Sequence, residues 1–140
     1  MAHDDWLDHL AQVPLFADCS RKQLQAVAAA TTELDVAAGK VLVREGDRGH
    51  EAFVIVEGSA SVVRKGQNIA TLKAGDVVGE LAPLTGGVRT ATVEAQTPML
   101  VLVIGQREFG ALLEDVPGLA VRVLHNLAHR MVELDALAFK

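Results

Sequence analysis

The sequence is poor in cysteine, in long apolar runs and in positive charge, and each shortage excludes a class of protein. Cys19 is the only cysteine, which excludes an internal disulfide and a Cys-x-x-Cys metal or redox pair. No apolar run is long enough to span a bilayer, and the N-terminus does not resemble a signal peptide. The net charge of −5 lacks the basic excess that a nucleic-acid or anionic-membrane surface requires. We therefore expect a cytoplasmic protein that binds neither nucleic acid nor a membrane.

The composition is that of one folded domain. Half of the 140 residues are hydrophobic and 22% are charged, which argues against a disordered chain. We divide the chain into a helical prelude at 1–31, a β-sandwich at 32–104 and C-terminal helices at 105–140.

Two helices are expected in the prelude. The first covers Asp4–Val13 and places four apolar side chains on or near one face: Trp6, Leu7, Leu10 and Val13. Pro14 ends this helix, and we expect the apolar residues 14–16 to dock on the core. Ser20 and Gln23 have the spacing of a capping box, which predicts a second helix that continues to about Ala30.

The middle of the chain has the alternation of short β-strands. The candidate strands are Glu33–Val36, Lys40–Arg44, Ala52–Glu57, Ser59–Lys65, Ile69–Lys73, Val88–Thr97 and Met99–Ile104. Short, evenly punctuated strands favour a β-sandwich or barrel over βαβ units. The apolar run at 53–56 is expected in the core. Five glycines are interpreted as turn residues with positive φ: Gly46, Gly49, Gly58, Gly66 and Gly75.

The stretch from Gly79 to Val93 has the pattern of an anion site. The strand-like pair Val77-Val78 leads to Gly79, and 80–84 favours one or two helical turns, whose N-terminus would offer unpaired N–H groups to an anion. Arg89 is the next charged residue, and its planar fork suits a phosphate. Glu80 would repel a phosphate in contact with it, so we expect its carboxylate to accept hydrogen bonds from a hydroxyl such as that of a ribose. Together these groups indicate a nucleotide.

This stretch resembles the phosphate-binding cassette of the cyclic-nucleotide-binding domain family, which includes catabolite activators and protein kinase regulatory subunits. The matching residues are 79–82 and 89–93, while Pro83 and Val88 depart from the family pattern without removing a ligand group. The resemblance implies an α+β fold built on an eight-stranded β jelly roll, flanked by N-terminal helices and a long C-terminal helix. It also implies a site formed by the following residues of the cassette: Gly79, Glu80, Leu81, Ala82, Arg89 and Thr90.

The resemblance assigns roles within the cassette. Arg89 would hold the cyclic phosphate, Glu80 would take the ribose 2′-hydroxyl, and the N–H groups of Ala82 and Thr90 would complete the phosphate cradle. The ligand would be cAMP or cGMP. Thr90 resembles a threonine of cGMP-selective members, but the basic residue that accompanies it there falls at Ala70, so we favour cAMP.

A long helix is expected from Pro117 to about Phe139. It carries an apolar stripe of Val121, Leu124, Leu127, Ala128, Met131, Leu134 and Ala138. This stripe is longer than a small sandwich can cover, so part of it needs another partner, either a second copy of the chain or a nucleotide base. The family resemblance places Met131 and Leu134 nearest the base. It places Val121, Leu124 and Ala128 closer to the sandwich or to a second subunit.

Catalysis and metal binding are not expected. His125, His129 and Glu133 share a helical flank, but they lack a further convincing ligand, and we interpret them as solvated. A sensor domain for a cyclic nucleotide is the first hypothesis, with an unidentified downstream protein receiving the signal. The alternative is a jelly-roll interaction or dimerisation module with a disused pocket, against which Glu80 and Arg89 argue. A DNA-binding regulator of the catabolite-activator type would add a helix-turn-helix after the long helix. Because the chain stops at Lys140, we do not expect this polypeptide to bind DNA.

Overall fold

Two antiparallel sheets form the body of the protein in a computed structural model that describes residues 7–8, 10–79, 87–116, 118–125 and 128. One sheet has the order β1-β8-β3-β6 and the other β2-β7-β4-β5. The strands are β1 Thr32–Val36, β2 Val41–Val43, β3 Ala52–Glu57, β4 Ala60–Arg64, β5 Gln67–Leu72, β6 Val77–Val78, β7 Thr92–Ala95 and β8 Met99–Ile104. The predicted fold, an α+β jelly roll with eight strands among the described residues, is confirmed.

The first sheet is covered on both faces, and its strand β3 is apolar and buried from Ala52 to Val56. Val54 and Val56 belong to the cluster that includes the helices. Phe53 and Ile55 belong to the cluster between the two sheets. Successive side chains of a strand point to opposite faces, so this short run supplies both layers of core. The expectation that 53–56 would be core is confirmed.

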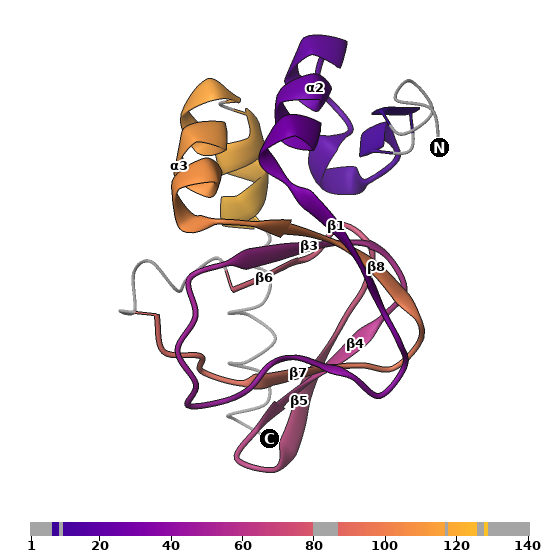
Figure 1. Cartoon of the computed structure of the whole chain (residues 1–140), viewed down its shortest axis with the longest axis vertical. Coiled ribbons are helices and arrows are strands. Elements are labelled where there is room, and N and C mark those ends of the chain that lie inside the picture. Colours follow the sequence, from indigo (N-terminus) through magenta and orange to yellow (C-terminus); the bar gives the residue numbers. More distant parts are fainter. Residues whose placement is uncertain (1–6, 9, 80–86, 117, 126–127, 129–140) are drawn as a thin grey trace.

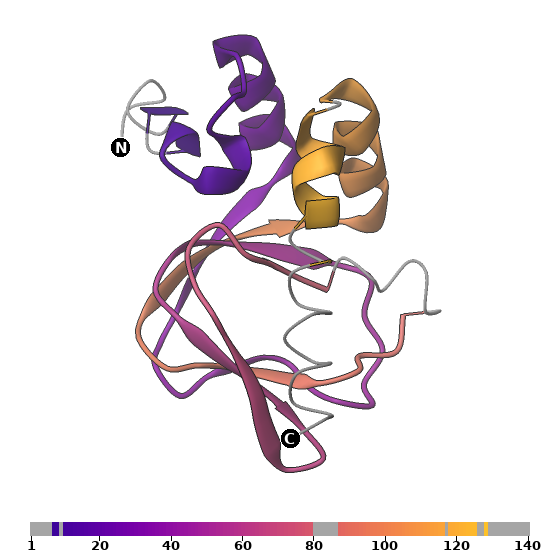
Figure 2. The ribbon, with the colours of Figure 1, turned by 180° about the vertical axis from the view of Figure 1, so that it is seen from behind.

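The helices gather on one side of the sheets, as both ribbon views show (Figures 1 and 2). They include the 3-10 turn η1 (Pro14–Phe16), α2 (Arg21–Ala30) and α3 (Gln106–Asp115). The predicted capping box of α2 is present, since Gln23 N–H donates to Ser20 Oγ at 3.1 Å and Ser20 N–H donates to Gln23 Oε1 at 2.8 Å. The expected docking of the η1 segment on the core is confirmed, because Leu15 and Phe16 are buried.

The first predicted helix is described only in part. Its apolar face is buried at Leu7, Leu10 and Val13 as expected, and Trp6 lies outside the described residues. None of the helices in the described part of the chain is both long enough and apolar enough to cross a membrane.

Two strands begin more than one residue away from their predicted starts, and in both places a turn or a loop contact sets the true limit. β5 begins at Gln67 rather than Ile69, because Lys65 and Gly66 form a tight turn with φ of 51° and 78° and pair Arg64 with Gln67. β7 begins at Thr92 rather than Val88. Val88 instead makes an isolated bridge to Arg48, in the loop between β2 and β3.

The start of the last helix packs through residues that the apolar stripe did not include. Residues 118–125 are helical, and they bury Leu119 and Val123, which lie one turn apart. Val121 and Leu124 are 52% and 62% exposed. Their exposure excludes the sandwich as their contact, while a second subunit stays a prediction. The C-terminal half of the expected helix lies outside the described residues.

Candidate functional site

Backbone hydrogen bonds fix the position of Arg89 against the loop that joins β2 to β3. The Arg89 N–H donates to Asp47 O at 2.9 Å, and the Arg89 carbonyl accepts from Gly46 N–H at 2.9 Å. The Gly49 N–H donates to Gly87 O at 2.8 Å. The segment before β7 is therefore bonded to this loop at Gly87 and at Arg89 itself. The loop is far from Arg89 in sequence but adjacent to it in the fold.

The side chain of Arg89 is buried, with 7% of the residue exposed. Its Nη2 donates to Glu51 O at 2.9 Å and reaches the Glu51 carboxylate at 3.5 Å. The guanidinium carbon lies 6.0 Å from the centroid of the Phe53 ring, at the outer limit of a cation–π contact. One half of the guanidinium fork is thus anchored to β3 and the residue that precedes it.

The other half of the fork has no such anchor. Arg89 Nη1 is buried and finds no hydrogen-bond partner among the residues that the structure describes. Buried polar groups are nearly always paired, and leaving one unpaired costs about 1–3 kcal/mol or more when it is charged. An anion that accepts from Nη1 would remove this cost, so the geometry favours an anionic ligand at this nitrogen.

Gly79 lies directly beside Nη1. β6 pairs with β3 through Phe53 and Val78, and this pairing delivers Gly79 to the edge of the site. A Cβ at Gly79 would overlap Nη1, and the φ of +83° also favours glycine. Because glycine has no Cβ, the guanidinium of Arg89 can lie against the backbone at Gly79. This contact is expected if Gly79 and Arg89 belong to one site.

Gly49 has a different role from the one predicted. Its φ lies outside the left-handed region, so the interpretation as a positive-φ turn is wrong. A Cβ added at Gly49 would stand 2.6 Å from Nη2 of Arg89 and 2.9 Å from Nε. The absence of a side chain allows the loop backbone to cover the guanidinium.

Thr90 follows Arg89 and is exposed. Its carbonyl accepts from Arg64 Nε at 3.0 Å, and two residues later Thr92 Oγ1 accepts from Glu45 N–H at 2.9 Å. These bonds tie the end of the cassette to β4 and to the loop after β2. The role predicted for the Thr90 N–H and hydroxyl stays a prediction.

The structure brings Gly79 and Arg89 together, with Thr90 next to Arg89 in the chain, and the other predicted site residues lie outside the described residues. These are Glu80, Leu81, Ala82, Met131 and Leu134. Sequence reasoning missed Glu51 and placed Phe53 only in the core. Glu51 precedes Arg89 by 38 residues, and no periodicity or motif connects the two positions.

A groove of about 640 Å³ borders this arrangement on the side of the first two strands. Glu51 and Phe53 contribute to it, together with Leu34, Val36, Val41 and Val103 among others. Its lining is mostly apolar, and Arg89 does not contribute to it.

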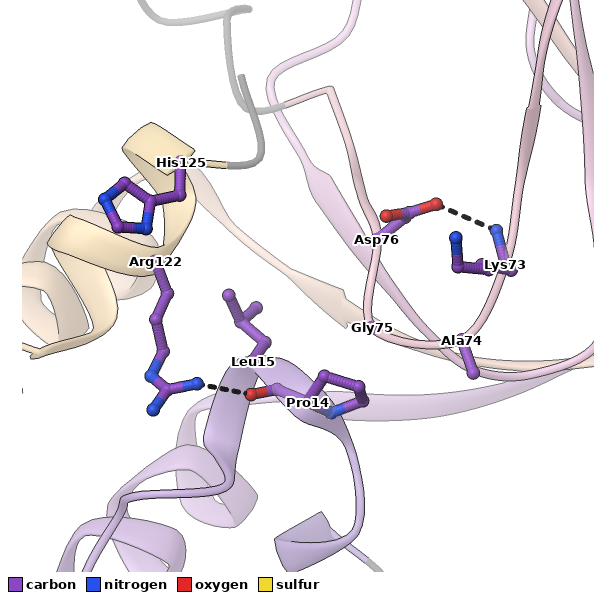
Figure 3. Close-up of a pocket in the computed structure, with 8 residues that line it drawn as sticks. All are labelled: Pro14, Leu15, Lys73, Ala74, Gly75, Asp76, Arg122 and His125. Atoms are coloured by element: carbon purple, nitrogen blue, oxygen red, sulfur yellow. Dashed lines mark hydrogen bonds between the residues drawn. The ribbon is translucent and has the colours of Figure 1, made fainter. Parts of the chain in front are cut away.

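A second groove, of about 360 Å³, lies where the helices meet the turn between β5 and β6 (Figure 3). On one wall Arg122 Nη1 donates to Pro14 O at 2.7 Å, and its Nη2 pairs with Asp18. On the other wall Asp76 accepts from Lys73 N–H at 2.9 Å. The bond to Pro14 and the ion pair join the last helix to the N-terminal turn, which is a structural role.

Metal binding finds no support in the described part of the chain, where no three His, Cys, Asp or Glu residues gather around a common point. His125 is exposed, and His129 and Glu133 lie outside the described residues. Cys19 is partly buried, and burial raises the pKa of its thiol. It lies in the helical layer and lines a small groove with Leu119.

Comparison with known proteins gives a consistent result. The family model of the cyclic nucleotide-binding domain matches residues 33–116. The cAMP-dependent protein kinase regulatory subunit of Schizosaccharomyces pombe is 32% identical over 127 residues, which are 90% of this chain and 30% of that protein. The cGMP-dependent protein kinase egl-4 of Caenorhabditis briggsae is 38% identical over 77 residues, 55% of this chain and 10% of that protein. The chain thus spans a third or less of the length of these relatives.

Among solved structures, cAMP-bound PfPKA-R (141–441) is similar to this chain with a TM-score of 0.82 and 26% identity. The similarity covers 96% of this chain and 47% of that one. It includes the helices as well as the sheets, since it extends over nearly the whole sequence.

Proposed function

The chain belongs to the cyclic nucleotide-binding domain family, and on that premise we propose a regulatory domain that binds cAMP in preference to cGMP and has no catalytic activity of its own. The observation that carries the proposal is the half-anchored guanidinium of Arg89. Its Nη2 is held by Glu51, while Nη1 is buried without a partner in the described part of the chain.

A cyclic phosphate matches the unpaired half of this fork. It carries one negative charge and two exocyclic oxygens, either of which can accept a charge-assisted hydrogen bond from Nη1. Glu80 would accept from the ribose 2′-hydroxyl, and the N–H groups of Ala82 and Thr90 would complete the cradle. These assignments, with Gly79 and Leu81 in the same cassette, are part of the proposal.

The preference for cAMP rests on the similarities and on one position of β5. The kinase regulatory subunit and the solved structure named above are a cAMP-dependent and a cAMP-bound protein. Ala70 occupies the place at which cGMP-selective members of the family carry a basic residue. Thr90 favours cGMP, as does the similarity to a cGMP-dependent kinase. A single neutral hydrogen bond contributes about 0.5–1.5 kcal/mol, which is too little to set the preference alone.

A disused pocket is the alternative function, and the burial of Arg89 argues against it. A module kept only for its fold or for dimerisation would gain stability from an apolar residue here, because a buried and half-paired cation is costly. Dimerisation remains compatible with nucleotide binding. The exposed Val121 and Leu124 would serve a second subunit or the downstream protein that receives the signal.

Calorimetric titration of the parent chain, Arg89→Ala and Arg89→Lys with cAMP and with cGMP tests the proposal. Hydrogen bonds to charged groups contribute about 1.5–3 kcal/mol. We therefore expect Arg89→Ala to bind about 10–100 times more weakly, and lysine to restore part of the loss because it lacks the planar fork. Thermal unfolding would verify that each variant is folded. Equal affinity of Arg89→Ala and parent would refute the site, and tenfold tighter binding of cGMP than of cAMP would refute the base preference.

A further inference from the structure

The anchored half of Arg89 is held by two different groups of one residue. The Glu51 carbonyl accepts from Nη2 at 2.9 Å, a normal hydrogen-bond length, whereas the Glu51 carboxylate stands at 3.5 Å, at the limit of a hydrogen bond. The carbonyl therefore supplies the directed bond that positions the guanidinium. The carboxylate acts mainly through its negative charge.

This charge lies beside the same guanidinium that would hold the phosphate. The Glu51 side chain is 56% exposed, and that of Arg89 is 6% exposed. Before a nucleotide arrives, the carboxylate partly neutralises the buried cation. Once a phosphate accepts from Nη1, two anions share one cation and repel each other. The carboxylate thus stabilises the nucleotide-free site more than the occupied one.

The surroundings of Glu51 limit the size of this effect. The carboxylate is not enclosed, because Glu51 lines an open groove of about 640 Å³ and its side chain is 56% exposed. This exposure allows water and salt to screen the charge, so the ion pair is weak. A moderate loss of affinity follows, rather than an occluded site.

We propose that Glu51 is an affinity-setting residue, whose carboxylate competes with the cyclic phosphate for Arg89 and keeps nucleotide binding weaker than the cassette alone would make it. This inference rests on the proposed function. It concerns the side chain of Glu51, because the backbone carbonyl would anchor Arg89 whatever residue stood at this position.

Glu51→Gln separates charge from geometry, because glutamine has the same shape and its amide oxygen can still accept from Nη2. Calorimetric titration with cAMP and cGMP at ~50 mM and ~500 mM salt would compare it with the parent. We expect about two- to fivefold tighter binding at low salt and a ratio close to one at high salt. Glu114→Gln is the matched control, since it removes the same charge from an exposed position on α3 and should leave affinity unchanged.

Failure of this inference and failure of the proposed function give different results. If the parent binds a cyclic nucleotide and Glu51→Gln binds it equally or more weakly at low salt, the inference is overturned and the proposed function stands. A gain that persists unchanged at high salt, or that Glu114→Gln reproduces, would also overturn it, because neither behaviour is expected of a local competing charge. If neither the parent nor Glu51→Gln binds cAMP or cGMP, the proposed function fails, and the inference fails with it.

Discussion

Replacing Gly49 by alanine tests whether the guanidinium of Arg89 must occupy the position seen in the structure. The added Cβ would stand 2.6 Å from Nη2, 2.9 Å from Nε and 3.1 Å from the guanidinium carbon. The φ of Gly49 lies outside the left-handed region, so alanine does not strain the backbone there. The effect of this substitution is therefore almost purely steric, because the added methyl group would clash with the guanidinium of Arg89.

The size of the effect follows from these distances. Non-bonded heavy atoms are in ordinary contact at about 3.5 Å or more, so Nη2 has to move by about 1 Å. A shift of that size misaligns the 2.9 Å bond to Glu51 O and moves Nη1 away from the position at which we propose that it binds the phosphate. Each charge-assisted hydrogen bond is worth about 1.5–3 kcal/mol. We expect cyclic-nucleotide affinity to fall about 10–100-fold, since each 1.4 kcal/mol is about a factor of ten.

Calorimetric titration with cAMP and cGMP, together with urea unfolding, would measure affinity and stability separately. Gly110→Ala is the matched control, because a Cβ at Gly110, within α3, would meet nothing within 4 Å. It should bind like the parent and be more stable by up to about 1 kcal/mol, the helix propensity difference between alanine and glycine. Parent-like affinity in a folded Gly49→Ala variant would refute the requirement for Arg89 in its present position.

Two further predictions concern the helical layer. Ser20→Ala removes the side-chain cap of α2 and should lower the free energy of unfolding by about 1 kcal/mol in urea titrations. Nucleotide affinity should not change. An unchanged free energy of unfolding would show that the cap contributes nothing. Because burial raises the pKa of the Cys19 thiol, a smaller fraction is thiolate at about pH 8 than in a free cysteine. Iodoacetamide should therefore alkylate Cys19 slowly in the native protein and faster in urea, and equal rates would contradict this expectation.

The sequence predicts an element accurately where residues next to that element determine its ends. β8 was predicted with its true bounds, Met99–Ile104, because Pro98 and Gly105 flank a continuous apolar run. α2 followed from its capping box. The start of β7 was misplaced because the residues before Thr92 have strand-like composition but pair with the loop after β2. No pattern within that segment distinguishes a ladder from a single bridge.

The same distinction separates the predicted from the missed parts of the site. Arg89 and Gly79 lie in one continuous motif, so the sequence alone indicates an anion site there. Glu51 and Phe53 lie near Arg89 because the backbone of Arg89 is bonded to the loop that leads into β3. Phe53 has the pattern of a core residue and is one, with 8% exposed. Its proximity to the guanidinium is a second role that the hydrophobic pattern does not encode.

Glycine illustrates why the site could not be completed from composition and spacing. Gly66 has a φ of +78° and open space around its missing Cβ, so the turn conformation is what requires glycine there. Gly49 has an ordinary φ and no room for a Cβ, so contact with Arg89 is what requires it. Gly79 meets both conditions. The sequence shows only glycine in a loop at all three positions, yet alanine would strain the backbone at Gly66 and would displace the guanidinium of Arg89 at Gly49.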